Sequence, residues 1–305
     1  MNKICLHVLP RQTMTWDCFV KNTPPGSIAL DGLVPEAPNT NVLTRHINFN
    51  HHEGVVRGAT MSTCMQVYTE IKQGLMGTYN LGEQVNVYIN DTDQDTAMAV
   101  WLLNNYKMFE GHSTNPVINR LLNLVDKLDI TAGSWPCSLS DSLTRQYCWI
   151  FEPYTSLRKS GHLYEADSRI LEDNINATMS RITKHMLSDS DEIDPDTRHE
   201  ILFNHPEFWV VNEIGGNDAR VYLFDKGMKA FISLVSTRSD GNRVFAVGKK
   251  KFANFDIVGF LKMCNERDVF KWGGSDTVIG SNRENGSTLQ WQDLVEIAKE
   301  VNGWT

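Results

Sequence analysis

The sequence lacks any long hydrophobic run, because no apolar stretch approaches the roughly 18–20 residues that a membrane-spanning helix needs. Its six cysteines are scattered, with no Cys-x-x-Cys pair, which argues against a disulfide framework and against a zinc site. The first residues also lack the layout of a signal peptide. These absences predict a cytoplasmic protein with reduced thiols and no membrane contact.

Positive charge is also scarce. The formal net charge is −8, which argues against a broad face for duplex DNA but is compatible with bound divalent cations. The composition, 41% hydrophobic and 22% charged, is that of an ordinary globular protein. Since 305 residues exceed what one hydrophobic core usually holds, we expect two domains.

In the first part of the chain, short strands alternate with helices. We predict strands at about 3–9, 27–30 and 42–49, then a helix at about 60–74. This order predicts an α/β fold with an open, mostly parallel sheet and helices on both faces. Ligands of such sheets bind at the carboxyl ends of the strands, where Asp31 and the pair His51–His52 are expected.

The most informative stretch is 85–103, VNVYINDTDQDTAMAVWLL. Alternating apolar residues at 85–89 predict a strand, and the apolar run at 97–103 predicts a buried helix. Asp91, Asp93 and Asp95 lie between them, and in an extended backbone all three would face one spot. Three like charges there favour a metal site. The simpler alternative is a polar turn with Asp93 or Asp95 as the N-cap of the helix.

The remaining chain predicts a helical connector and a second domain. Helices are expected at about 115–128 and 164–187, followed by the acidic run 188–196. We therefore predict a domain at 1–195, with a helical connector at about 141–195, and a smaller α+β domain at 205–305. In the smaller domain we expect strands at 220–225, 229–237 and 243–249 and helices at about 255–265 and 290–301.

A glycine-rich segment at 272–281 lies in the second domain. Gly273, Gly274 and Ser275 could offer backbone N–H groups to a phosphate, although Gly-Gly is also common in simple turns. Arginine side chains match phosphate geometry, so Arg57, Arg238 and Arg283 are further candidates, each of which could equally form a surface salt bridge.

The chain resembles the DHH phosphoesterase superfamily, which includes family II pyrophosphatases, single-strand exonucleases and oligonucleotide phosphodiesterases. The triplet Asn50-His51-His52, followed by Ser62-Thr63-Cys64 at a helix start, is similar to the family's Asp-His-His motif. The run Asp91, Asp93, Asp95 and Ala97 resembles its carboxylate motif, Asp31 its lone aspartate after a strand, and Asp129, or less clearly Asp126, its aspartate at a helix end. Segment 272–281 resembles a variant of its terminal glycine loop.

The resemblance implies two Mn²⁺ or Mg²⁺ ions, and carboxylates with one imidazole suit Mn²⁺ better than Zn²⁺. It places Asp31 between the ions and makes His52 a substrate contact or general acid and Asp93 a catalytic residue. The ligands that it implies for the two ions are Asp91 and Asp93 for one, and Asp95, His51 and Asp129 for the other.

The function predicted in this way is metal-dependent hydrolysis of a nucleotide, a small phosphodiester or a short single-stranded oligonucleotide. Duplex DNA is not expected as a substrate, and a homodimer is left open. The alternative is a degenerate relative that binds a nucleotide or metal without hydrolysis, or that serves as an interaction module. Three departures bear on it: the carboxylate run follows the histidine pair instead of preceding it, Asn50 replaces aspartate, and the glycine loop has Ser275-Asp276 instead of histidine. A histidine pair can also be structural, hydrogen-bonded at a strand end.

Overall fold

The computed structural model describes residues 3–77, 84–282 and 284–304, and its contacts divide the chain into two units. Unit 1 contains Met1–Ile130, Trp149–Tyr154 and Ala166–Glu192. Unit 2 contains Thr131–Cys148, Thr155–Glu165 and Ile193–Thr305. The chain therefore passes between the units several times, and its last passage lies in the acidic run. The two domains predicted from the sequence stay a prediction.

Unit 1 is built on a five-stranded sheet in the order β1-β5-β2-β4-β3. The neighbouring pairs β1–β5, β5–β2 and β2–β4 are parallel, and only the edge strand β3 runs antiparallel, to β4. The carboxyl ends of β5, β2 and β4 therefore meet at one edge of the sheet. The strands are β1 (Lys3–Val8), β2 (Ile28–Leu30), β3 (Asn39–Asn41), β4 (His46–Phe49) and β5 (Gln84–Ile89).

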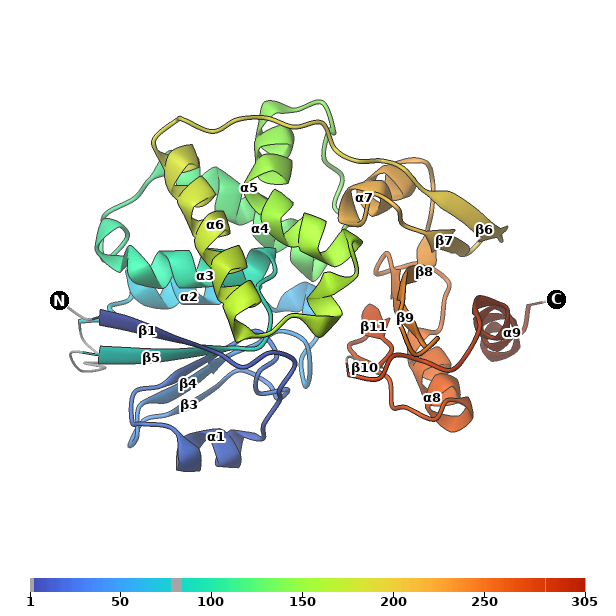
Figure 1. The fold of residues 1–305 in the computed structure, drawn as a ribbon, viewed down its shortest axis with the longest axis horizontal. Helices are drawn as coiled ribbons and strands as arrows, with labels where there is room; N and C mark the ends of the chain where they lie inside the picture. Colours follow the sequence, from blue (N-terminus) through green and yellow to red (C-terminus); the bar gives the residue numbers. More distant parts are fainter. Residues whose placement is uncertain (1–2, 78–83, 283, 305) are drawn as a thin grey trace. The chain divides into compact units, whose positions relative to one another are not determined.

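Helices cover both faces of this sheet, as Figure 1 shows. The short helix α1 lies on one face, where Phe19 packs against Ala29 and Leu33. The other helices of unit 1 cover the opposite face, and the helix following β5 is buried on all sides from Ala97 to Leu103. The helical elements are α1 (Trp16–Asn22), η1 (Arg57–Ala59), α2 (Thr63–Lys72), α3 (Gln94–Asn104), η2 (Tyr106–Met108), α4 (Pro116–Ile130) and α6 (Ser168–Met186).

Helix α5 (Ser142–Lys159) contributes residues to both units, and η3 (His162–Glu165) belongs to unit 2. Unit 2 contains a six-stranded sheet in the order β10-β11-β9-β8-β7-β6, antiparallel except for the pair β7–β8. Its core includes Phe208, Phe245 and Phe260. The remaining elements are β6 (Glu200–Asn204), β7 (Trp209–Asn212), α7 (Asn217–Asp225), β8 (Ala230–Thr237), β9 (Arg243–Lys249), α8 (Ile257–Arg267), β10 (Gly273–Gly274), β11 (Val278–Gly280) and α9 (Trp291–Asn302).

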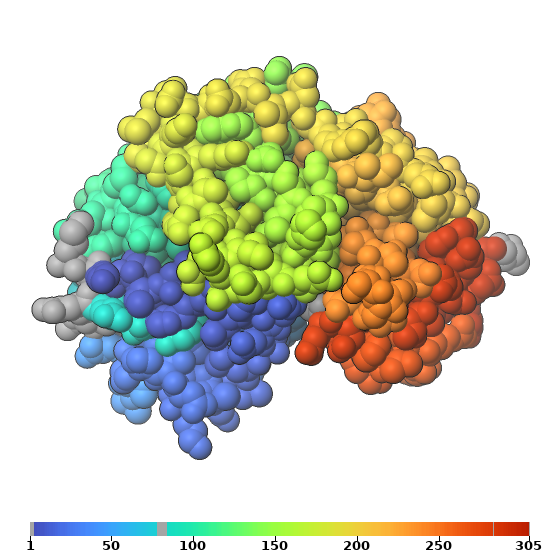
Figure 2. Space-filling view, in the orientation of Figure 1, coloured from blue at the N-terminus to red at the C-terminus, as the bar shows by residue number. Residues whose placement is uncertain are grey.

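The predicted α/β fold class is confirmed, with a mostly parallel sheet in unit 1 and a mixed sheet in unit 2. Figure 2 shows, in the same orientation, the surface that the side chains of the two units form. None of the helices within the described ranges has both the length and the hydropathy that a membrane span requires.

Two local predictions are wrong. Residues 220–225 form the end of helix α7 instead of a strand, because Arg220, Leu223 and Phe224 are buried by tertiary contacts at helical spacing. The predicted strand at 42–49 is only β4, because residues 42–45 form a turn that connects it to β3. Val42 and Leu43 in this turn are 73% and 94% exposed, so their hydrophobic character does not reflect burial in a sheet.

Candidate metal centre

Three adjacent strand ends bring the candidate residues of unit 1 together. Asp31 follows β2, His51 and His52 follow β4, and Asp93 lies four residues after β5. Because β5, β2 and β4 are neighbours in one parallel arrangement, these side chains share the carboxyl edge of the sheet. Asp95 in the first turn of α3 and Asp129 at the end of α4 reach the same place.

His51 lies at the centre of the cluster. Its Nε2 atom is 2.8 Å from Asp129 Oδ2, 3.4 Å from Asp31 Oδ1 and 3.5 Å from Asp95 Oδ2. The His51 and Asp95 side chains are at most 1% exposed, whereas that of Asp129 is 23% exposed. His51 Nε2 and Asp129 Oδ2 are buried, and no described group completes a well-directed hydrogen bond to either of them. Three carboxylates therefore lie beside one imidazole nitrogen, and the ligand atoms of His51, Asp95 and Asp129 are all within 4.8 Å of one another, whereas Asp31 forms a second such group with His51 and His52.

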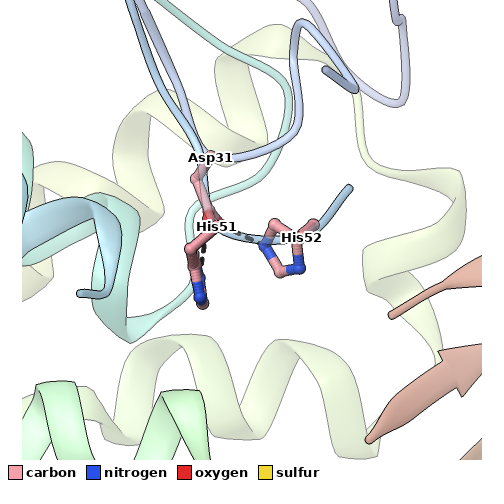
Figure 3. A group of neighbouring side chains, drawn as sticks. All are labelled: Asp31, His51 and His52. Atoms are coloured by element: carbon pink, nitrogen blue, oxygen red, sulfur yellow. Dashed lines mark hydrogen bonds and ion pairs between the residues drawn. The ribbon is translucent and has the colours of Figure 1, made fainter. Parts of the chain in front are cut away.

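Asp31 joins His51 to His52. Its Oδ1 atom accepts a hydrogen bond of 2.8 Å from His52 Nε2 and one of 3.1 Å from the Thr63 hydroxyl. Figure 3 shows the Asp31 side chain directed at both imidazole rings. The backbone of Asp31 has a φ of 45°, in the left-handed region that non-glycine residues rarely adopt. Such backbone strain is typical of functional sites, where the surrounding structure holds a residue in place.

Helix α2 fixes Asp95 and Asp126 through its first backbone N–H groups. Asp95 Oδ2 accepts from Thr63 N at 2.7 Å and Oδ1 accepts from Cys64 N at 2.8 Å. Asp126 Oδ1 accepts from Ser62 N at 2.9 Å, and its Oδ2 binds Lys127 Nζ at 2.9 Å. A helix N-terminus stabilises carboxylates through free N–H groups and the helix dipole. Asp126 is therefore part of the scaffold, and Asp129 is the α4 aspartate that faces His51.

Asp93 is the N-cap of α3, because its Oδ1 accepts from Thr96 N at 2.9 Å. The helix begins immediately after it, so Asp95 does not continue an extended backbone and the expected i, i+2, i+4 alignment of the three aspartates is wrong. Asp91 bonds Thr92 N at 2.7 Å through Oδ1, and its Oδ2 accepts from the Tyr154 hydroxyl at 3.3 Å. Asp91 and Asp93 lie outside the groups whose ligand atoms are all mutually within 4.8 Å.

The carboxyl groups perturb one another strongly. Burial, together with Asp129 and Asp31, raises the pKa of Asp95 to about 7. Burial and the charges of Asp31 and Asp91 raise the pKa of Asp93 well above its usual range. Burial would also raise the pKa of Asp129, but His51 and Arg57 hold it below its usual value. The cluster therefore contains more negative charge than its own cations neutralise.

The carboxylates raise the pKa of His51, and the two histidines in turn lower that of Asp31. Although burial favours the neutral ring, Asp129 and the other carboxylates raise the pKa of His51 to about 10. For Asp31, burial would raise the pKa, but the neighbouring His52 and His51 hold it well below its usual range. A divalent cation would offset the same repulsion without a proton, and carboxylate oxygens with one imidazole nitrogen suit Mn²⁺ or Mg²⁺.

The predicted phosphate ligands lie in different units. Arg57 is in unit 1, 5% exposed, with its guanidinium on His52 and Asp129. Arg238, Gly273, Gly274 and Ser275 are in unit 2. Arg238 Nε lies 3.4 Å from Asp240 Oδ2, and Ser275 N and Oγ both donate to Val278 O.

The two glycines lie in strand β10, and Gly274 has a φ of 135°. A Cβ atom at Gly274 would lie 2.3 Å from Val278 O, so close packing of the β10–β11 turn by itself requires a glycine at this position. Arg283 lies outside the described residues.

The threonine hydroxyls that bond Asp31 were not predicted as site residues. Thr63 Oγ1 donates to Asp31 Oδ1, and Thr96 Oγ1 lies 3.4 Å from Asp31 Oδ2. Each threonine is in the first turn of a helix whose N-terminus points at the cluster. The only signal that the sequence offers is the N-cap residue that precedes each one, Ser62 before Thr63 and Asp93 before Thr96.

Unit 1 also has a cavity of about 740 Å³ between strands β3 and β4 and helix α2, lined by Thr40, Phe49, Gln66 and Glu70 among others. None of the clustered residues around His51 lines it, so the convergence of ligand atoms, and not the size of this cavity, identifies the candidate centre. No protein-family model and no curated protein matches the chain.

Proposed function

We propose that this protein is a metal-dependent phosphohydrolase that acts on a nucleotide, a small phosphodiester or a short single-stranded oligonucleotide. One observation carries the proposal: His51 Nε2 lies within 3.5 Å of carboxylate oxygens from Asp31, Asp95 and Asp129. These four residues come from four separate segments of the chain. Buried carboxylates that converge in this way repel each other unless a cation lies between them.

The residues fit a hard divalent cation. Three carboxylates and one imidazole form the donor set, and no group in the described ranges makes a well-directed hydrogen bond to the buried atoms His51 Nε2 and Asp129 Oδ2. Asp129 also lies at the C-terminal end of α4, where the helix dipole disfavours negative charge and favours a cation. Asp31, His51, Asp95 and Asp129 would hold one ion, and Asp93 and Asp91, with Asp31 shared, are proposed for a second.

Bound ions of this kind supply positive charge that activates a water molecule and offsets the charge on the reacting phosphate. The chain itself orients the ligands. The N-terminus of α2 holds both oxygens of Asp95, and His52 and Thr63 hold Oδ1 of Asp31. These contacts prearrange the carboxylates, so little reorganisation is needed when charge develops on the substrate.

The alternative is a module that binds a metal or nucleotide without hydrolysis. Asn50 favours it, because its amide is fully buried and donates to Glu36 O at 2.8 Å and to Glu53 Oε2 at 3.2 Å. Asn50 therefore supports the loop that carries the histidines and contributes no carboxylate to the cluster. The difference between the two functions lies in turnover, which a direct assay measures.

The test is hydrolysis of bis(p-nitrophenyl) phosphate with added Mn²⁺, comparing the parent protein with Asp93→Asn. Asparagine is as good an N-cap as aspartate, so helix α3 should persist while the charge is lost. We expect the rate to fall by about 10²-fold or more. Asp173→Asn is the matched control, because Asp173 is an exposed residue of α6.

Equal rates in the parent and Asp93→Asn would contradict the catalytic proposal. Mn²⁺ binding is measured in parallel from the electron paramagnetic resonance signal of free Mn²⁺. Mn²⁺ binding without turnover supports the non-hydrolytic alternative. If Mn²⁺ does not bind, both the hydrolase and the metal-binding module are contradicted.

A further inference from the structure

Arg57 contacts two residues of the cluster around His51. Its Nη1 lies 2.8 Å from His52 Nδ1, and its Nη2 donates to Asp129 O at 3.0 Å and to Asp129 Oδ1 at 3.2 Å. The residue is only 5% exposed. The guanidinium fork is therefore directed at two residues of the cluster and not at solvent, where a substrate phosphate would approach.

These contacts determine the proton position on His52. An arginine guanidinium can only donate hydrogen bonds, so His52 Nδ1 must act as the acceptor. In the neutral ring the proton is then on Nε2, and this atom lies 2.8 Å from Asp31 Oδ1, which accepts it. His52 thus transmits the position of Arg57 to Asp31, and its Nε2 is not available as a metal ligand.

The other nitrogen of the Arg57 guanidinium, Nη2, forms a second branch of contacts, which acts on Asp129. Arg57 Nη2 engages Oδ1 of this carboxylate, and the other oxygen, Oδ2, is the one that lies 2.8 Å from His51 Nε2. The bond from the same nitrogen to the backbone carbonyl of Asp129 fixes the end of α4. One planar fork thereby orients two carboxylates on different elements, which the single ammonium of a lysine cannot do.

We propose that Arg57 is a positioning residue for the metal centre: it holds His52 as the Nε2–H tautomer that orients Asp31, and it turns Asp129 Oδ2 toward His51. The inference rests on the proposed metal-dependent function. It differs from the expectation that Arg57 binds the substrate phosphate, because a phosphate ligand would affect substrate affinity and leave metal affinity unchanged.

The first experiment measures Mn²⁺ affinity from the electron paramagnetic resonance signal of free Mn²⁺. Arg57→Lys keeps the positive charge and removes the fork, so a loss of affinity reports geometry and not charge. We expect Mn²⁺ to bind about 10–100-fold more weakly to Arg57→Lys and to His52→Gln, as for other residues that support metal ligands. Arg120→Lys, the same change at an exposed position of α4, should match the parent.

The double variant Arg57→Lys/His52→Gln separates the two branches. If Arg57 acts partly through His52, the losses are less than additive, because removing His52 already disconnects Asp31. Parent-like Mn²⁺ affinity in Arg57→Lys, with a raised KM for bis(p-nitrophenyl) phosphate, would instead make Arg57 a phosphate ligand and overturn the inference. Far-UV circular dichroism and a thermal melt establish that each variant is folded.

The second experiment does not depend on the metal. Two-bond ¹H–¹⁵N correlation spectra of the metal-free parent, labelled with ¹⁵N-histidine, report the tautomer of each ring. The His52 signals are those missing from His52→Gln. We expect the Nε2–H tautomer in the parent, and in Arg57→Lys a changed chemical shift of His52 Nδ1, because that variant removes the guanidinium donor to this atom. An Nδ1–H tautomer in the parent overturns the inference, even if a variant fails to fold. If the parent has the expected tautomer but binds no Mn²⁺, the proposed function fails and the positioning role fails with it.

Discussion

Asp95 is subject to two opposing forces, and the Asp95→Asn substitution measures which one dominates. Both of its oxygens accept backbone N–H groups, from Thr63 and Cys64, which favours the charged form. Burial and the nearby Asp129 and Asp31 disfavour it and raise the pKa to about 7. The raised pKa means that repulsion and burial outweigh the two hydrogen bonds in the metal-free protein.

The size of the effect follows from linkage. A folded-state pKa of about 7, against the ordinary aspartate value of 3.8, costs at most about 4 kcal/mol once Asp95 is ionised. The unfolded chain releases this proton near pH 4 and the folded chain near pH 7, so stability falls as the pH rises between these values. From pH 5.0 to pH 6.5 the expected loss is about 2 kcal/mol.

His51 contributes in a different window. Because its pKa is raised from 6.5 to about 10, its stabilising contribution is complete below about pH 6.5 and is lost as the pH rises toward 10. Measurements that stop at pH 6.5 therefore leave out most of the His51 window. Asp93, whose pKa is also raised, is present in both the parent and Asp95→Asn, so the difference between the two proteins reports Asp95. In Asp95→Asn the pH dependence due to Asp95 disappears, and a constant loss of about 1–3 kcal/mol replaces it, because the new amide N–H₂ faces one backbone donor.

The assay is hydrogen–deuterium exchange of the buried α3 amides, with EDTA present and with correction for the intrinsic exchange rate at each pH. Between pH 5.0 and pH 6.5 the free energy of opening should fall by about 2 kcal/mol more in the parent than in Asp95→Asn. Asp173→Asn should behave as the parent does. Equal changes in the parent and Asp95→Asn would refute the electrostatic reasoning. Saturating Mn²⁺ should remove the excess pH dependence of the parent.

Two further predictions concern unit 2. Asp268→Asn should destabilise it by about 1.5–3 kcal/mol at pH 7, because Asp268 accepts from Trp272 Nε1 at 2.7 Å and from the Ser287 hydroxyl at 2.5 Å. Burial would raise the pKa of Asp268, but these bonds lower it. The stability that Asp268 contributes is therefore present above pH 4 and is lost as the pH falls. Urea unfolding should show a smaller cost of Asp268→Asn at pH 3.5 than at pH 7. Glu213→Leu should lower the free energy of unfolding in urea by about 3–5 kcal/mol, because it leaves the buried Arg220, 2.6 Å from Glu213 in the parent, without its carboxylate. Glu213→Leu/Arg220→Met should recover most of this stability. If it does not, the loss comes from packing and not from the unpaired charge.

The strand–helix unit around Asp93 shows what local pattern can predict. Alternating apolar residues become β5, and the continuous apolar run becomes the buried helix α3, because both signals are properties of consecutive residues. The alternative interpretation of Asp93 as an N-cap is confirmed. It does not exclude the metal role, since one carboxylate oxygen caps the helix and the charge of the group still acts on Asp31 and Asp95.

Local pattern failed where tertiary contacts decide the conformation. The segment 220–225 is rich in residues that favour strands, yet it forms part of α7, because Arg220 pairs with Glu213 and lies 4.2 Å from the Phe231 ring centroid. Strand β6 was not predicted, because it is mostly exposed and carries little hydrophobic alternation. Propensity is a weak guide when burial is set by distant segments.

The candidate centre could be predicted only in part from the sequence, and the rest needed the tertiary structure. The sequence alone placed Asp31 and the histidine pair at strand ends and indicated that parallel strands would bring these ends together, because strand direction and polarity are local properties. The resemblance already favoured Asp129 over Asp126, but the physical reason comes only from the tertiary structure, in which Asp129 faces His51 and Asp126 holds the start of α2. The inward direction of Arg57 also depends on the tertiary structure, because it follows from contacts between η1 and the end of α4. These two elements are far apart in the sequence, so the spacing of residues along the chain does not predict the distance between Arg57 and Asp129.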